Sequence, residues 1–104
     1  MTISILDLRY LIRSAMINRQ LVEFFYDGQY VLGEPHVYGI KINEIHLLVY
    51  QIDGQSNNAR LPKWRDVPAE KISDFRLLRY HFQGKRTSGI NVQRDFDKIL
   101  EIVG

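Results

Sequence analysis

Three cations surround the only tryptophan of this 104-residue chain. Arg60, Lys63 and Arg65 lie within a stretch of six residues and flank Trp64 in the segment RLPKWRDV. Guanidinium groups make forked hydrogen bonds with phosphate, and an indole ring offers a face on which a nucleobase can stack. This combination of residue types favours binding of an anionic ligand, either a nucleotide or a single-stranded nucleic acid.

Trp64 fits more than one structural role. If residues 63–67 are extended, Lys63 and Arg65 share one face of a strand and Trp64 takes the other. The tryptophan can then fill the core of the domain, offer a stacking platform to a base, or lie in a protein interface. We expect the core position, and the other two stay open.

The positive charge is concentrated in the middle of the chain. Residues 60–86 carry eight Lys and Arg against three Asp and Glu, a net charge of +5, whereas residues 1–53 have a net charge of −2. Such a patch attracts anionic partners, although a solvated basic face has the same composition. The candidate ligand-binding residues are Arg60, Lys63, Trp64, Arg65, Lys71, His46, Tyr50 and Arg86.

Catalytic chemistry has little support in the sequence. His36, His46 and His81 lack the spacing of a metal-binding motif, and the seven glycines are too scattered for a phosphate loop or a dinucleotide fingerprint. The chain has no cysteine, which excludes thiolate nucleophiles and disulfides and is compatible with a reducing cytoplasm. We therefore expect a noncatalytic cytoplasmic protein without metal or cofactor.

The N-terminus does not resemble a signal peptide. Asp7 and Arg9 interrupt its apolar segment MTISILDLRYLI, and no basic region precedes that segment. No apolar run approaches the roughly 20 residues that a membrane-spanning helix needs. We expect a single soluble domain over residues 1–104, with no membrane partner.

A helix is expected at each end of the chain. Residues 4–18 have apolar residues at helical spacing, with Ser4 as the N-cap. Residues 91–103 repeat this pattern, and Asn91 is the candidate N-cap. We therefore expect the segment of residues 20–82 to lie between two terminal helices.

The segment between the helices predicts about five antiparallel strands over residues 20–82. Asp27 and Gly28 are typical of a tight hairpin turn. Gly33 and Pro35 predict a bulge or bend in the second strand. Because so short a set of bent strands would expose one apolar face as a flat sheet, we expect it to curl into a small β-barrel.

The stretch from Gln20 to Leu78 resembles the WYL-domain family, in particular its small stand-alone bacterial proteins. The similarity lies in the segments FFYDG, GEPHVYGI, LLVYQIDGQS and PKWRDVPAEKISDFRLL. The resemblance implies a five-stranded Sm-like, Src-homology-3-like small barrel. It also implies a regulatory module that senses nucleotides or single-stranded nucleic acid through basic and aromatic residues.

The match to the family is incomplete at its usual ligand-facing positions. The name-giving Trp-Tyr-Leu would fall on Ile45, His46 and Leu47, so that only the leucine is shared. The arginine usual four residues before the proline of the Glu-Pro pair falls on Val31. Lys71 lies where the family usually has a basic residue.

A protein-interaction or homo-oligomeric assembly module with no small ligand is the alternative function. Leu6, Tyr10 and Ile17 lie off the main apolar stripe of the first helix, whose apolar surface is therefore wider than one core requires. The leading prediction is a ligand-sensing or accessory module for an anionic ligand. The alternative predicts a second copy or another protein as the partner.

Overall fold

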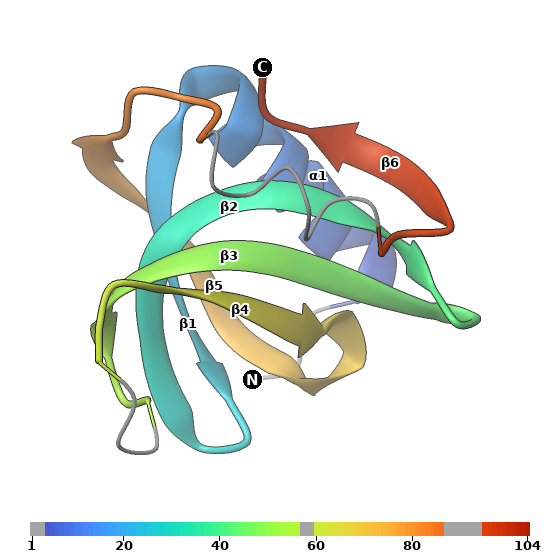
Figure 1. Cartoon of the computed structure of the whole chain (residues 1–104), viewed down its shortest axis with the longest axis horizontal. Coiled ribbons are helices and arrows are strands. Elements are labelled where there is room, and N and C mark those ends of the chain that lie inside the picture. Colours follow the sequence, from blue (N-terminus) through green and yellow to red (C-terminus); the bar gives the residue numbers. More distant parts are fainter. Residues whose placement is uncertain (1–3, 57–59, 87–94) are drawn as a thin grey trace.

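A computed structural model describes residues 4–56, 60–86 and 95–104, which form one helix and six strands (Figure 1). The elements in chain order are α1 (Ile5–Asn18), β1 (Gln20–Tyr26), β2 (Gln29–Lys41), β3 (Glu44–Gly54), β4 (Lys63–Pro68), the 3-10 turn η1 (Ala69–Lys71), β5 (Ile72–His81) and β6 (Lys98–Ile102). The prediction of a mainly β domain with an N-terminal helix is confirmed. No helix within these described residues is long and apolar enough to span a bilayer.

Helix α1 begins at the cap that the sequence indicates. The side-chain oxygen of Ser4 accepts a hydrogen bond of 3.2 Å from the backbone N–H of Asp7. The helix ends at Arg19, which has the left-handed conformation at φ 53° and returns its own N–H to the last turn. The buried side chains of the helix are Leu8, Ile12, Ala15 and Met16.

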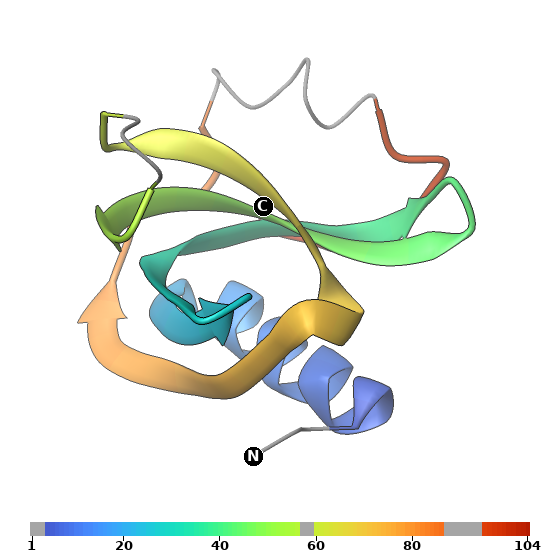
Figure 2. The ribbon, with the colours of Figure 1, turned by 90° about the horizontal axis from the view of Figure 1, so that it is seen from below.

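The strands form one antiparallel sheet with the order β4-β3-β2-β1-β5, and β6 pairs with β2. The long strand β2 shares its first half with β1 and its second half with β6, which follows β2 on the side away from β3 (Figure 1). The sheet is not closed, because no ladder joins the edge strands β4 and β5 in the described part of the chain. Figure 2 shows that β4 runs into η1 and turns back as β5, with α1 beside it.

The predicted hairpin and the predicted bend of the second strand are both confirmed. Asp27 and Gly28 have φ angles of 49° and 77°, which a tight turn of the primed kind needs. The pairing of β2 with β3 shifts register after Leu32 and again after Pro35. A side chain could not replace Gly33 at the first shift, because its Cβ would lie 2.5 Å from the carbonyl oxygen of Tyr50.

The prediction of a C-terminal helix over residues 91–103 is wrong for residues 98–102, which form β6. Residues 91–94 lie outside the described part of the chain. The helical spacing of apolar residues was outweighed by backbone groups along the second half of β2, which need hydrogen-bond partners that β6 supplies. Val103 continues this attachment by donating its backbone N–H to the carbonyl of His36 at 3.0 Å.

Close approach of β6 depends on Gly39 in β2. A Cβ at this position would lie 2.3 Å from the carbonyl oxygen of Lys98. Asp97 secures the start of the strand, because its carboxylate accepts the backbone N–H of Ile42 at 2.8 Å. The sixth strand is therefore fixed by contacts between segments about sixty positions apart in the chain.

Apolar side chains from α1 and from the inner face of β1 to β5 make the core. Phe24 of β1 and Phe75 of β5 stack with their ring centroids 5.8 Å apart. The core also includes Val31, Tyr38, Leu47, Val49 and Val67, all essentially inaccessible to solvent. The opposite, outer face of β2, β3 and β4 carries most of the predicted ligand-binding residues of these strands.

Candidate functional site

Trp64 lies on the outer face of β4 and not in the core. Val67, three positions after Trp64 and two after Arg65, is fully buried in the core. Because side chains alternate along a strand, the face of β4 that carries Val67 and Arg65 is the inner one. The predicted alternation between Trp64 and Arg65 is confirmed, but the expected core position of the tryptophan is wrong. The physical reason is the alternation of side chains along the strand. Because the smaller Val67 packs into the core, Trp64 must lie on the opposite face.

Four rings gather on the outer face around Trp64. The Trp64 ring centroid is 5.0 Å from that of Tyr50 and 4.9 Å from that of His36, both with edge-to-face geometry. The His36 ring is in turn 5.3 Å from the ring of Phe82. We call His36, Tyr50, Trp64 and Phe82 the aromatic cluster. It joins β2, β3 and β4 to the segment that follows β5.

A buried carboxylate lies next to the aromatic cluster. Glu34 is only 4% exposed, and its two oxygens accept hydrogen bonds from Nε and Nη2 of Arg86 at 2.7 and 2.8 Å. His36 Nε2 lies 2.9 Å from the same carboxylate. The guanidinium of Arg86 also lies over the ring of Tyr50, 4.1 Å from its centroid.

The charge state of Glu34 follows from these contacts. Burial by itself would raise the pKa of this carboxyl, but the hydrogen bonds and charges of Arg86 and His36 outweigh it and lower the pKa to about 2. Because an ionised carboxylate can only accept hydrogen bonds, His36 Nε2 is the donor in their contact. The negative charge of Glu34 is therefore permanent at neutral pH and is matched by Arg86.

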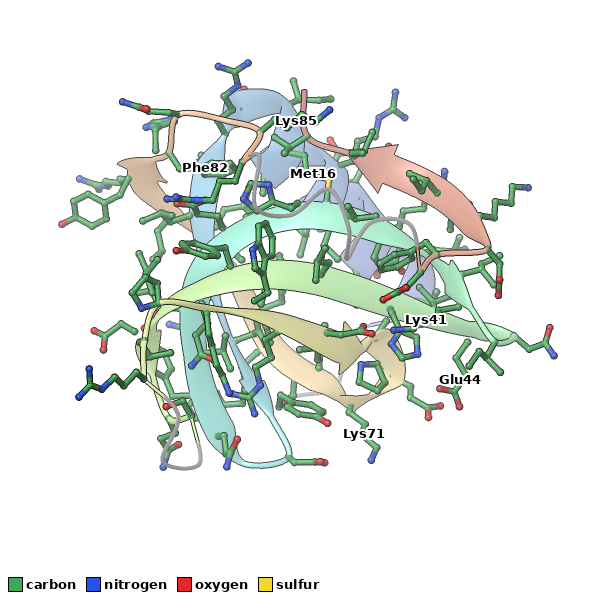
Figure 3. All side chains as sticks on the ribbon, in the orientation of Figure 1. Met16, Lys41, Glu44, Lys71, Phe82 and Lys85 are labelled. Carbon is green, nitrogen blue, oxygen red and sulfur yellow. The ribbon has the colours of Figure 1, made fainter. Side chains whose placement is uncertain are left out.

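A cleft of about 520 Å³ opens beside Glu34 and Arg86. One side of it is basic, with His81, Lys85 and Arg86, and Phe82 adds an aromatic wall. The remaining lining residues are Leu21, Glu34, Ile52, Gln83 and Gly84. We call this hollow the 81–86 cleft. Figure 3 shows Phe82 and Lys85 on the same side of β2.

The backbone of the 82–86 segment is fixed by the end of α1. The backbone N–H of Phe82 donates to the carbonyl of Arg19 at 2.9 Å. The side chain of Arg19 donates to the carbonyl of Gln83 at 3.1 Å and to that of Gly104 at 3.2 Å. The wall of the cleft is thus held at both ends, by Arg19 at one and by the Arg86–Glu34 pair at the other.

Arg65 has a structural position, because its guanidinium points to the inner side. It donates to the side-chain oxygen of Gln51 at 3.0 Å, to the carbonyl of Gln55 at 2.9 Å and to Gln29 at 2.6 Å. The guanidinium also lies 5.2 Å from the ring centroid of Tyr26. Arg65 therefore ties β4 to the end of β3 and to the β1–β2 turn.

His46 belongs to a second polar group at the other end of the outer face. Its Nδ1 lies 2.8 Å from Asp66 and its Nε2 lies 3.3 Å from Glu44. Lys41 donates to the other oxygen of Asp66 at 2.6 Å, which raises the pKa of that lysine. Figure 3 shows Lys41 and Glu44 far from the 81–86 cleft. Within the described ranges no group of three or more His, Cys, Asp or Glu side chains is suited to a metal ion.

The remaining predicted cations lie apart from the cleft. Lys71 is 3.8 Å from Asp27 and half exposed, and Figure 3 shows it on the opposite side of the molecule from Phe82 and Lys85. Arg60 is exposed, and Lys63 is half-buried at the start of β4. The structure therefore brings together only three of the eight candidates. These three are Tyr50, Trp64 and Arg86.

Sequence reasoning missed the residues that complete this site. Glu34 and His36 alternate along β2 and so share a face, a signal that was available once the strand was recognised. His81 and Lys85 belong to the basic segment HFQGKR, which begins at the last residue of β5. What the sequence could not indicate is that this segment returns over β2.

Comparison with protein-family models, curated proteins and solved structures gave no match, so the WYL resemblance stays a prediction.

The different settings of Arg65 and Lys71 predict different responses to substitution. Arg65→Ala lowers the free energy of unfolding by about 2 kcal/mol, because it leaves the fully buried Gln51 without its guanidinium donor. Lys71→Ala changes it by less than about 0.5 kcal/mol, since its ion pair is exposed. Urea unfolding of both variants measures the contrast. Equal losses would show that the Arg65 contacts do not form in solution.

Proposed function

We propose that this protein is a noncatalytic ligand-sensing or accessory module that binds an anionic ligand, a nucleotide or a single-stranded nucleic acid, in the 81–86 cleft. The observation that carries the proposal is the meeting of His81, Lys85 and Arg86 with the ring of Phe82 around a hollow of about 520 Å³. This volume falls in the range of roughly 300–1,000 Å³ that is usual for small-molecule sites.

The electrostatics of the cleft support an anion. The one carboxylate in its wall, Glu34, is already compensated by the forked contact with Arg86. Lys85 is exposed and makes no ion pair with another described residue, so its charge is available to a ligand. The net charge of +5 over residues 60–86 adds a longer-range attraction.

Planar side chains at the cleft could bind the base of a nucleotide. The Phe82 ring lines the cleft. The guanidinium of Arg86, which also lines the cleft, lies over the ring of Tyr50. Planar groups of both kinds stack on nucleobases, and each such contact is worth roughly 1–3 kcal/mol. A phosphate at Lys85 and His81 with a base against Phe82 would use both walls of the cleft at once.

The arrangement of the strands also supports the finer assignment to the Sm-like small-barrel class. The edge strands β4 and β5 are connected by the three residues of η1, which bring the two ends of the five-strand order together. The WYL resemblance implies a small barrel of this class and a regulatory role, and we propose a cytoplasmic location for the protein.

Fluorescence anisotropy with labelled oligothymidylate, oligouridylate and ATP tests the proposal across a salt titration. Lys85→Ala should weaken binding of the preferred probe about tenfold, equivalent to 1.4 kcal/mol. For a single strand it should also reduce the slope of log affinity against log salt by about 0.7, because one phosphate contact is lost.

The matched control is Lys98→Ala, which removes an exposed lysine of β6 that does not line the cleft. This variant should bind like the unmodified protein. The proposal fails if none of the three probes binds at low ionic strength. It fails equally if both lysine variants lose the same affinity, since binding would then be diffuse.

A further inference from the structure

Helix α1 presents a second apolar surface that points away from the core. Leu6, Tyr10 and Ile17 are 81%, 71% and 69% exposed. At about 100° of rotation per residue, these three side chains and Arg13 fall within a stripe roughly 60° wide, opposite the buried face of the helix. Single exposed apolar residues are ordinary, but a contiguous stripe of large ones marks an interaction surface.

The spacing of this stripe allows it to pack against a second copy of the same helix. Positions 6, 10, 13 and 17 follow one another at intervals of four, three and four, which read the same from either end of the helix. Alternating intervals of three and four are those of paired helices. In an antiparallel pair related by a two-fold axis, Leu6 faces Ile17 of the second copy, and Tyr10 faces Arg13 of the second copy.

The chemistry of the facing side chains is complementary in that arrangement. Leu6 and Ile17 would cover each other's apolar surface, and the Arg13 guanidinium would lie against the ring of Tyr10. The Arg13 side chain is 65% exposed, and its ion pair with Glu101 is long at 3.8 Å, so its guanidinium can turn to the second copy. The carboxylate of Glu101 lies near both Arg9 and Arg13, at 2.8 and 3.8 Å, so it offsets part of the positive charge where two copies of Arg13 would approach.

We propose that this protein forms a homodimer in which two copies of α1 pack antiparallel through Leu6, Tyr10, Arg13 and Ile17. The contact is isologous, because each copy contributes the same four positions, and such two-fold dimers are the commonest assemblies of soluble proteins. No residue of α1 lines the 81–86 cleft. The dimer is therefore independent of the proposed ligand site, and the failure of one proposal leaves the other standing.

Light scattering across a wide range of protein concentration tests for the dimer. The unmodified protein should have the mass of two chains, and Tyr10→Glu should weaken association at least about tenfold, because it places a carboxylate in the middle of the apolar contact. Tyr80→Glu is the matched control. Tyr80 is also 71% exposed but lies on β5, so its variant should remain a dimer. Circular dichroism verifies that both variants stay folded.

Disulfide trapping tests the direction of the helices, since the chain has no cysteine of its own. The double variant Leu6→Cys with Ile17→Cys should form a covalent dimer on mild oxidation, whereas Leu6→Cys alone should not. The two positions are about 16 Å apart along one helix, too far for a disulfide within one chain.

Three outcomes would overturn the proposal. A single-chain mass at every concentration excludes the dimer. Cross-linking of Leu6→Cys alone shows parallel helices and excludes the antiparallel contact. A monomer that binds vesicles of anionic lipid, and loses that binding in Tyr10→Glu, assigns the stripe to a lipid surface instead.

Discussion

Replacing Arg86 with alanine lowers the free energy of unfolding by about 3 kcal/mol, because it leaves the buried carboxylate of Glu34 without its partly exposed guanidinium partner. Glu34 is nearly inaccessible to solvent, and two of the hydrogen bonds to its carboxylate come from the Arg86 guanidinium. His36 remains as a donor in the variant, which keeps the loss at the lower end of the range for broken buried pairs. Urea unfolding at neutral pH measures the difference.

The adjacent lysine provides the control for this prediction. Lys85→Ala removes an exposed cation without an ion pair in the described part of the chain, so it changes stability by less than about 0.5 kcal/mol. Glu34→Gln and the double variant Glu34→Gln with Arg86→Ala complete a double-mutant cycle. An Arg86→Ala loss no larger than that of Lys85→Ala would show that the forked contact is absent in solution.

Acid removes about 3 kcal/mol of stability through Glu34 alone. The ordinary pKa of this carboxyl is 4.5, and in the folded protein it is lowered to about 2. Since the folded protein holds the proton less tightly than the unfolded chain, the stabilisation is complete above about 4.5 and is lost as the pH falls towards 2. Each pKa unit corresponds to about 1.4 kcal/mol.

Unfolding free energies of the unmodified protein and of Glu34→Gln across this acid range isolate the contribution. The difference between the two proteins should shrink by about 3 kcal/mol as the pH falls, because only one of them has a carboxyl at position 34. Glu44→Gln is the control, since that side chain is 60% exposed. Parallel profiles for the unmodified protein and Glu34→Gln would mean that the pKa of Glu34 is not lowered.

The features that the sequence predicted well are those decided within a few residues. The cap at Ser4 needs only the N–H of Asp7, three positions away. The hairpin at Asp27 and Gly28 needs only two residues that tolerate positive φ. The bend of β2 follows from Gly33 and Pro35, which interrupt a strand wherever they occur.

The features that the sequence did not predict depend on partners far along the chain. Residues 98–102 have an apolar spacing that suits a helix, and only the open edge of β2 makes them a strand. The position of Trp64 could not be derived either, because either face of β4 could have been the inner one. Arg65 looked like a ligand contact since its neutral acceptors, Gln29 and Gln51, come from two other strands.

Gly39 limits which residues related sequences can have at this position of the sheet. A Cβ there would lie too close to the backbone carbonyl of Lys98, so we expect a side chain at this position to push β6 away from β2. We therefore expect homologues that keep this C-terminal strand to have glycine at position 39. In a set of homologues, loss of that glycine should coincide with loss or divergence of the C-terminal strand.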